Sequence, residues 1–153
     1  MPLLLRTAEL RDLKDLAAMR HALWPDGTLE EHTREAAELL AGRMPSPLPS
    51  VILLAEDREG HIVGFIEAGL RSHADGCDPA HPLGFVEGWF VHENSRNQGT
   101  GGALMRAAED WARSQGCREM ASDTWIDHEL SQHAHVSLGF EIVDRCVHFR
   151  KAL

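Results

Sequence analysis

A short glycine-rich segment, residues 96–102 (RNQGTGG), constrains the fold of this chain more than any other feature of its sequence. It directly follows a β-like run, residues 84–91 (GFVEGWFV), and precedes a run with apolar residues at helical spacing. A strand, a tight turn and a helix are therefore expected in succession. In that order the first helical amides lack backbone partners, and together with the helix dipole they favour a bound pyrophosphate.

This loop differs from the two best-known phosphate-binding loops. It lacks the Lys-Ser/Thr pair of a P-loop, and its glycines are not spaced as in a dinucleotide-binding turn. Glycine lets the backbone approach a ligand closely, and an arginine adds a charge-assisted contact. The alternative is a glycine-rich turn that merely begins an ordinary helix. We expect the ligand to be held by Arg96, Asn97, Gln98, Gly99, Thr100, Gly101 and Gly102.

The rest of the chain predicts a mixed sheet flanked by helices. Strands are expected at residues 3–6, 51–55, 61–70, 84–91, 120–123 and 140–150, and helices at 10–23, 29 to about 42, 101–115 and 131–138. Thr28 and Glu31 form a capping-box pattern before the second helix. The resulting order, β-α-α-β-β-β-α-β-α-β, indicates an α/β (α+β) fold. At 153 residues, we expect one domain spanning 1–153.

The charge balance restricts the class of partner. Asp and Glu number 24 against 15 Lys and Arg, which disfavours nucleic acid and suits a cationic small molecule. Alternatively, the acidic surface only aids solubility. No apolar run approaches a membrane helix, and residues 1–6 lack a signal-peptide pattern, so we expect a cytoplasmic protein without a membrane partner. Three scattered cysteines, and His133 and His135 two positions apart, predict neither disulfides nor a metal site.

The loop resembles that of the GNAT acetyltransferase superfamily, whose R/Q-x-x-G-x-G/A motif grips the pyrophosphate of coenzyme A. Arg96, Gly99 and Gly101 match this motif, and the later Leu138-Gly139-Phe140 falls in the expected order. The resemblance covers the whole chain. It implies a mostly antiparallel central sheet, acetyl-CoA as co-substrate and no metal.

Four further segments are similar to the aminoglycoside 6'-N-acetyltransferases of antibiotic resistance. They are residues 23–25 (LWP), 84–88 (GFVEG), 116–124 (GCREMASDT), and 131–135 leading into 138–141 (LGFE). The similarity implies that Glu87 and Asp123 line the aminoglycoside site, that Trp24 is a substrate-side aromatic residue, and that His135 lies near the cofactor. It also implies direct acetyl transfer in a ternary complex, and a homodimer.

The chemistry of amine acetylation independently requires a base. An aliphatic amine is protonated at neutral pH and attacks a thioester only after losing a proton, so a nearby carboxylate is needed. Glu87 and Asp123 are candidates because both lie in otherwise apolar strand segments near the loop. Alternatively, Glu87 faces solvent or makes a structural hydrogen bond, and Asp123 caps a turn. We expect Glu67 to be a solvated strand residue.

Two other candidate residues also have structural interpretations. Trp24 could equally wedge a helix end into the core, and His135 could be an ordinary helix-surface histidine. The chain contains no tyrosine, the residue with which many GNAT enzymes protonate the leaving thiolate. Here either His135 or water protonates the thiolate, or no acid is needed. Two other functions stay open: acetylation of another amine, such as a polyamine or a protein N-terminus, and a non-catalytic acyl-CoA sensor.

Overall fold

The computed structural model describes residues 3–43 and 48–153 and contains one five-stranded sheet with the strand order β1-β2-β3-β4-β5. Neighbouring strands are antiparallel except for β4 and β5, which run parallel. This mixed, mostly antiparallel sheet confirms the predicted fold class. The elements are β1 (Leu4–Thr7), η1 (Leu10–Asp12), α1 (Leu13–Leu23), α2 (Leu29–Leu40), β2 (Ser50–Glu56), β3 (Ile62–Arg71), β4 (Leu83–Val91), η2 (Glu93–Ser95), α3 (Thr100–Ser114), β5 (Met120–Ser122) and α4 (Glu129–Ser137).

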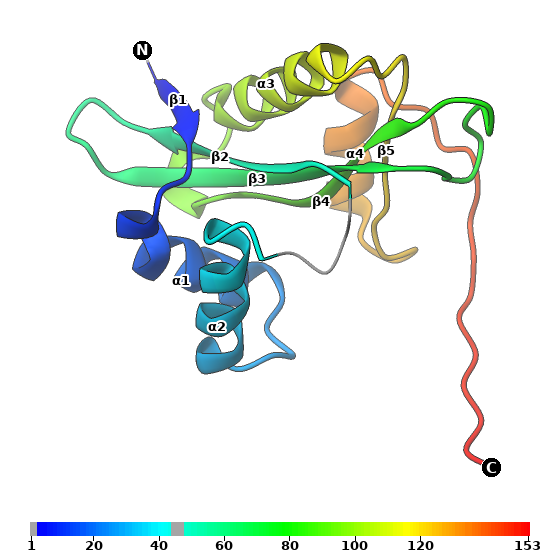
Figure 1. Cartoon of the computed structure of the whole chain (residues 1–153), viewed down its shortest axis with the longest axis horizontal. Helices are drawn as coiled ribbons and strands as arrows, with labels where there is room; N and C mark the ends of the chain where they lie inside the picture. Colours follow the sequence, from blue (N-terminus) through cyan, green and yellow to red (C-terminus); the bar gives the residue numbers. More distant parts are fainter. Residues whose placement is uncertain (1–2, 44–47) are drawn as a thin grey trace.

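Helices cover both faces of the sheet, so the core consists of two layers. Figure 1 shows α1 and α2 on one face and α3 on the other. On the first face Leu16 and Met19 of α1 pack with Phe65 of β3. On the second face Leu104 and Met105 of α3 belong to a separate cluster. The sheet is therefore buried on both sides, and its two ends are the places where a site can open.

The predicted capping box at the start of α2 is present. The hydroxyl oxygen of Thr28 accepts a hydrogen bond from the Glu31 amide at 3.1 Å, and the Glu31 carboxylate accepts one from the Thr28 amide at 2.9 Å. These two bonds satisfy donors that the first helical turn leaves free, and such a cap contributes about 1 kcal/mol. Local sequence therefore fixes where α2 begins.

An ion-pair network anchors β1 to its neighbours. Two nitrogens of Arg6 each lie 2.8 Å from an oxygen of Asp12, and its Nε lies 2.8 Å from Glu56. Asp12 is buried and also accepts a hydrogen bond from the Glu9 amide at 2.8 Å. The Arg6 guanidinium holds the pKa of the Asp12 carboxyl below its usual value of 3.8. The network therefore makes part of the stability of the fold depend on pH.

The C-terminal segment departs from the prediction. We expected a strand at residues 140–150, but residues 140–153 form no regular secondary structure. Within the part of the chain that the structure describes, no backbone–backbone hydrogen bond reaches residues 141–153, and Figure 1 shows them running away from the sheet. A strand exists only where another edge satisfies its amides and carbonyls. The sequence pattern of a strand is present, but among the described residues it pairs neither with the open outer edge of β5 nor with any other strand.

Candidate active site

The sheet opens where β4 and β5 separate. The two strands pair only at Gly84–Met120, Phe85–Ala121 and Val86–Ser122. On the other side of β4, Ala68 pairs with Val86 and Glu67 with Gly88, so that Glu87 has no partner and forms a β-bulge. A bulge bends its strand and redirects a side chain. Beyond Val86, the edge of β4 that faced β5 is therefore free.

The two candidate carboxylates lie at the mouth of this opening. Val86 and Ser122 are paired, and the next residues on the two strands are Glu87 and Asp123. The structure thus brings together, at one level of the sheet, two residues that are 36 positions apart in the sequence (123 − 87). Both are exposed.

An acidic cavity of about 970 Å³ adjoins this opening, and Asp123 is among the residues that line it. Its walls are the loops that follow β3 and β5, part of α4, and the start of the C-terminal segment. Six carboxylates line the cavity, against two guanidinium groups, those of Arg71 and Arg145. This imbalance favours a cationic ligand. The carboxylates are those of Asp75, Glu109, Glu119, Asp123, Glu141 and Asp144.

An exposed tryptophan beside Asp123 was not predicted. The side chain of Trp125 is 71% exposed and lines the acidic cavity. An exposed indole in a cavity offers an apolar face against which a ligand ring can pack. The sequence feature that could have indicated Trp125 is its position two residues after Asp123, in the loop that follows β5.

Glu87 is held by an arginine that the sequence analysis also missed. Nε and one terminal nitrogen of Arg71 lie 3.0 and 2.8 Å from the two oxygens of Glu87. The same guanidinium lies 3.5 Å from the ring centroid of Phe85, which is buried. Because Arg71 is 16 residues before Glu87, no local pattern indicates this pairing.

The glycine-rich loop has the geometry of an anion site. Gly99 is the N-cap of α3 with a φ of 84°, and Asn97 also has a positive φ, of 60°. The first helical hydrogen bond runs from Ala103 to the Gly99 carbonyl, which leaves the amides of residues 100–102 without an intrahelical acceptor. Within the described residues, no side chain caps this helix end, and its first turn carries no acidic residue. The loop therefore fits a pyrophosphate bound through its amides.

The loop side chains contribute less than its backbone. Arg96 donates from Nε to the Val91 carbonyl at 2.8 Å, and Gln98 donates to the Asn94 carbonyl at 3.2 Å. Thr100 is buried, with 3% of its surface exposed. These three residues shape the turn, and Arg96 keeps its exposed charge next to it.

Trp89 links the loop to α4. Its indole N–H donates to the Gly101 carbonyl at 3.1 Å, and a Cβ on Gly101 would lie 3.1 Å from its ring, so this position favours glycine. His135 of α4 packs edge-on against Trp89, with ring centroids 5.2 Å apart. The structure therefore places His135 behind the loop, in contact with it through Trp89. Trp89 was not predicted, although its strand directly precedes the loop.

The hydrogen bonds of His135 define its tautomer. Nδ1 lies 2.7 Å from the Ser131 carbonyl, which can only accept, so Nδ1 carries the proton. Nε2 then accepts from the Ser122 hydroxyl at 2.8 Å. Both ring nitrogens are engaged, and the side chain ties α4 to the end of β5.

Trp24 lies at the C-terminal end of α1, against β4. A Cβ on Gly88, the residue after Glu87, would lie 2.6 Å from the Trp24 ring, so the two are in close contact. The Arg20 guanidinium lies 4.9 Å from the Trp24 ring centroid, and Phe65 meets the ring edge-on. Trp24 therefore packs as a wedge between helix and sheet, next to a candidate catalytic residue.

The expectation that Glu67 is a solvated strand residue is wrong. Glu67 is 8% exposed and forms an ion pair with Arg20, which is also buried and lies 3.0 Å from Glu35. Burial raises the pKa of Glu67, although Arg20 opposes this shift. The prediction failed because the partner comes from α1, 47 residues earlier.

The described part of the chain offers neither a metal cluster nor a membrane span. Residues 3–43 and 48–153 contain no group of three or more His, Cys, Asp or Glu side chains placed to hold a metal ion. No helix among them is long and apolar enough to cross a membrane.

Comparison with known proteins agrees with this geometry. The model of the acetyltransferase (GNAT) family matches residues 16–140. An aminoglycoside N(6')-acetyltransferase type 1 of Klebsiella aerogenes is 43% identical over 98% of this chain and 97% of its own. The corresponding protein of Serratia marcescens is 40% identical over 89% of this chain and 90% of its own.

Solved structures show the same architecture. The aminoglycoside acetyltransferase AAC(6')-Iy, solved with the bisubstrate analogue CoA-S-monomethyl-acetylneamine, superposes with a TM-score of 0.86 at 31% identity and full coverage of both chains. AAC(6')-Ih of Acinetobacter baumannii also gives 0.86, at 29% identity and 99% coverage of each chain. The chain therefore belongs to the acetyltransferase (GNAT) family, whose enzymes take their acetyl group from acetyl-CoA.

Proposed function

We propose that this enzyme transfers the acetyl group of acetyl-CoA to the 6'-amino group of aminoglycoside antibiotics. The observation that carries the proposal is the position of Glu87 and Asp123, one residue beyond the last pair of β4 and β5. Asp123 lines the acidic cavity, and Glu87 lies on the strand that leads into the glycine-rich loop. Relatives at 43% and 40% identity carry the name of this activity and support the assignment. Acetylation removes a positive charge from the drug, and resistance follows from that change.

Binding of the donor rests on residues 96–102, where the free amides of residues 100–102 face the pyrophosphate. Acetyl-CoA supplies the activated thioester. The free edge of β4 beyond Val86 lies between the loop and the carboxylates, where it directs the acetyl end toward the acceptor. His135 supports this arrangement from behind, through Trp89.

Glu87 and Asp123 act on the acceptor. Their charges bind the ammonium group, and one of them, directly or through water, accepts its proton. The neutral amine attacks the thioester carbonyl carbon, and as the carbon–sulfur bond breaks its nitrogen loses a second proton to solvent and becomes the amide. Coenzyme A leaves as the thiolate, which takes up a proton. We infer that solvent supplies this last proton, because both ring nitrogens of His135 are already engaged. Trp24 positions β4 beside Glu87 and is the proposed aromatic wall of the acceptor site.

The cellular setting is also part of the proposal. Cys77, Cys117 and Cys146 are all free, as expected in a reducing compartment, and acetyl-CoA is a cytoplasmic metabolite. We therefore place the enzyme in the cytoplasm, with the whole chain acting as one domain.

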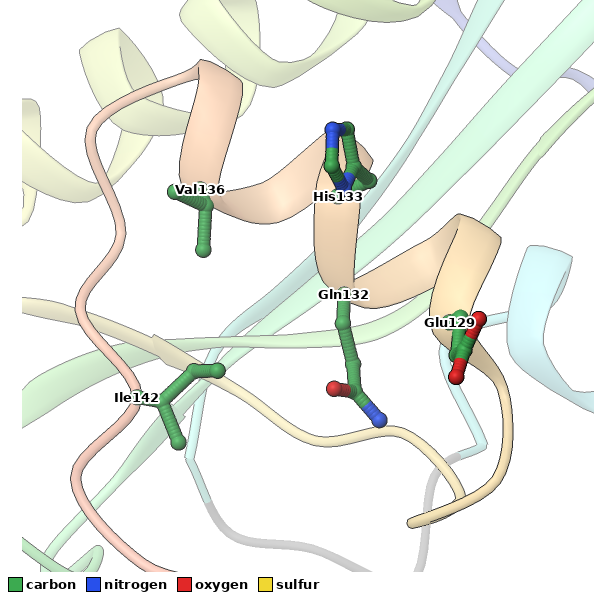
Figure 2. A pocket seen from close by; sticks show the side chains of 5 residues that line it. All are labelled: Glu129, Gln132, His133, Val136 and Ile142. Atoms are coloured by element: carbon green, nitrogen blue, oxygen red, sulfur yellow. The ribbon is translucent and has the colours of Figure 1, made fainter.

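A homodimer accounts for the exposed C-terminal segment. Val147 and Phe149 are 69% and 93% exposed and Leu153 is fully exposed, and the backbone around them lacks partners within the described residues. Figure 2 shows Gln132, Val136 and Ile142 facing a hollow of about 300 Å³ between α4 and this segment. A second copy of the chain, offering the same strand-like segment, would cover these surfaces and satisfy the backbone.

The dimer is tested by light scattering coupled to size exclusion. Val147→Asp and Phe149→Asp place charges on the exposed apolar side chains, whereas Lys151→Ala changes a polar residue of the same segment. We expect a dimer for the wild type and Lys151→Ala, and a monomer for the two aspartate variants. A wild type that elutes as a monomer contradicts the dimer.

A panel of amines distinguishes the proposed acceptor from its competitors. Thiol release from acetyl-CoA is followed with an aminoglycoside, a polyamine such as spermidine, and a peptide with a free N-terminus. Preference for the aminoglycoside supports the proposal, and preference for another amine replaces the acceptor but keeps the reaction. Coenzyme A binding without thiol release for any amine would favour the sensor.

A further inference from the structure

Arg71 pairs with the carboxylate of Glu87, to which the acceptor amine is proposed to bind. Its guanidinium makes two hydrogen bonds to Glu87, at 3.0 and 2.8 Å, so that both carboxylate oxygens are used. Arg71 lines the acidic cavity, whereas Glu87 is not among the described residues that line it. Arg71 therefore stands between the cavity and Glu87, and a positively charged acceptor must compete with it.

The ion pair between Arg71 and Glu87 is weak enough for an acceptor to displace the arginine. The side chains of Arg71 and Glu87 are 43% and 42% exposed, and ion pairs with such exposure are weak. The ring of Phe85 lies 3.5 Å from the guanidinium and gives it a second resting contact that does not depend on Glu87. The arginine can leave the carboxylate and still keep a favourable contact.

The number of positive charges on the acceptor decides whether it gains by displacing Arg71. A monoamine that displaces Arg71 exchanges one cation for another and gains little. A polyamine replaces the guanidinium at Glu87 and at the same time places its other ammonium groups near Asp123, Asp75 or Glu119, which line the same cavity. We propose that Arg71 sets a threshold for acceptor binding by competing for Glu87, so that only acceptors whose further ammonium groups reach the other carboxylates of the cavity bind well.

The inference rests on the proposed function, and two acceptors that share the reacting group test it. Kanamycin is the polyamine, and 6-amino-6-deoxyglucose, the single sugar that carries its 6'-amine, is the monoamine. Arg71→Met removes the charge but keeps a stem over Phe85, and Arg71→Lys keeps the charge without the two-pronged contact. Arg43→Met is the matched control, because it removes an exposed arginine that pairs with Glu38 of α2, and neither residue lines the cavity.

In Arg71→Met we expect KM to fall by a similar factor for both acceptors, about two- to fivefold, because each is relieved of the same weak competitor, and kcat should stay near that of the wild type. KM for the monoamine should remain the higher of the two. Arg71→Lys should fall between Arg71→Met and the wild type, and Arg43→Met should match the wild type. An unchanged KM for both acceptors in Arg71→Met, or a fall in kcat alone, would overturn the inference. If Arg71→Met does not fold, the Arg71→Lys comparison decides by the same criterion.

A second measurement shows whether Arg71 acts through Glu87. Calorimetric binding of the monoamine to the coenzyme A-loaded protein is compared for Arg71→Met in the wild-type and Glu87→Gln backgrounds. The gain in affinity should be present in the wild-type background and absent in the Glu87→Gln background. An equal gain in both backgrounds would contradict the proposed competition. Absence of acetylation by the wild type with either acceptor would instead count against the proposed function, so the two failures can be told apart.

Discussion

Val86 on β4 pairs with Ser122 on β5, and this is the last residue pair that the two strands share. The next residue on each strand is a carboxylate, Glu87 on β4 and Asp123 after β5. The opening of the sheet and the placement of its acidic groups therefore have the same origin. A parallel pair that ends early, together with a bulge at Glu87, provides both the opening and the two exposed carboxylates beside it.

The two carboxylates should be needed for turnover but not for donor binding. Glu87→Gln and Asp123→Asn keep the side-chain shape and remove the charge. A misplaced or missing general base costs about 10²–10⁴ in rate, so kcat should fall by that order in at least one variant while the Kd for coenzyme A is unchanged. Steady-state kinetics and calorimetry measure the two quantities. Unchanged turnover in both variants would remove the roles assigned to these residues.

Gly99 should matter for its backbone conformation alone. Its φ of 84° is unfavourable for alanine, and nothing lies within 4 Å of the position of a Cβ. The strain of about 1–2 kcal/mol in Gly99→Ala is relieved if the loop shifts, and coenzyme A binding should weaken about tenfold.

Gly116 provides the matched control for this substitution. It follows the other end of α3 with a φ of 87° and equally open surroundings. Gly116→Ala should lower thermal stability by a similar amount and leave coenzyme A binding intact. If the two variants bind coenzyme A equally well, the loop backbone is not the anion site.

Asp12 should make folding stability depend on pH. Because its pKa is lower in the folded protein than its usual value of 3.8, its contribution is present above that value and is lost as the pH falls through the folded pKa. Asp12→Asn should lower the free energy of unfolding at neutral pH by about 1.5–3 kcal/mol and reduce the further loss below about pH 4. Denaturant unfolding at several pH values measures this. Asp110→Asn, at an exposed ion pair, should change the free energy of unfolding little. Equal losses for Asp12→Asn and Asp110→Asn would contradict the special contribution of Asp12.

The buried pair of Arg20 and Glu67 should behave asymmetrically. Glu67→Ala removes the buried partner of the Arg20 guanidinium, which keeps its contact with the exposed carboxylate of Glu35, and should cost about 3 kcal/mol of unfolding free energy. The double variant Arg20→Met with Glu67→Met removes both charges and should recover most of that loss. Denaturant titration checks both variants. A double variant as unstable as Glu67→Ala would mean that packing, and not the lone charge, causes the loss.

Local patterns predicted most of the fold, and long-range contacts account for what they missed. The capping box at Thr28 and the turn at Gly99 depend on neighbouring residues, so both could be read from the sequence. The burial of Glu67 depends on Arg20, and the state of Glu87 depends on Arg71, each supplied by a different element. The segment at 140–150 has the composition of a strand, but composition does not say whether the segment pairs, and it does not pair with the open outer edge of β5.

We propose that this chain acetylates the 6'-amine of an aminoglycoside. The most direct test is free-thiol release from acetyl-CoA with kanamycin as acceptor, beside its counterpart that carries a hydroxyl in place of the 6'-amine. We expect rapid thiol release with kanamycin and little with the hydroxyl compound. Equal release with both would place the reaction on a different amine, and no release with either, while coenzyme A binds, would contradict the proposed function.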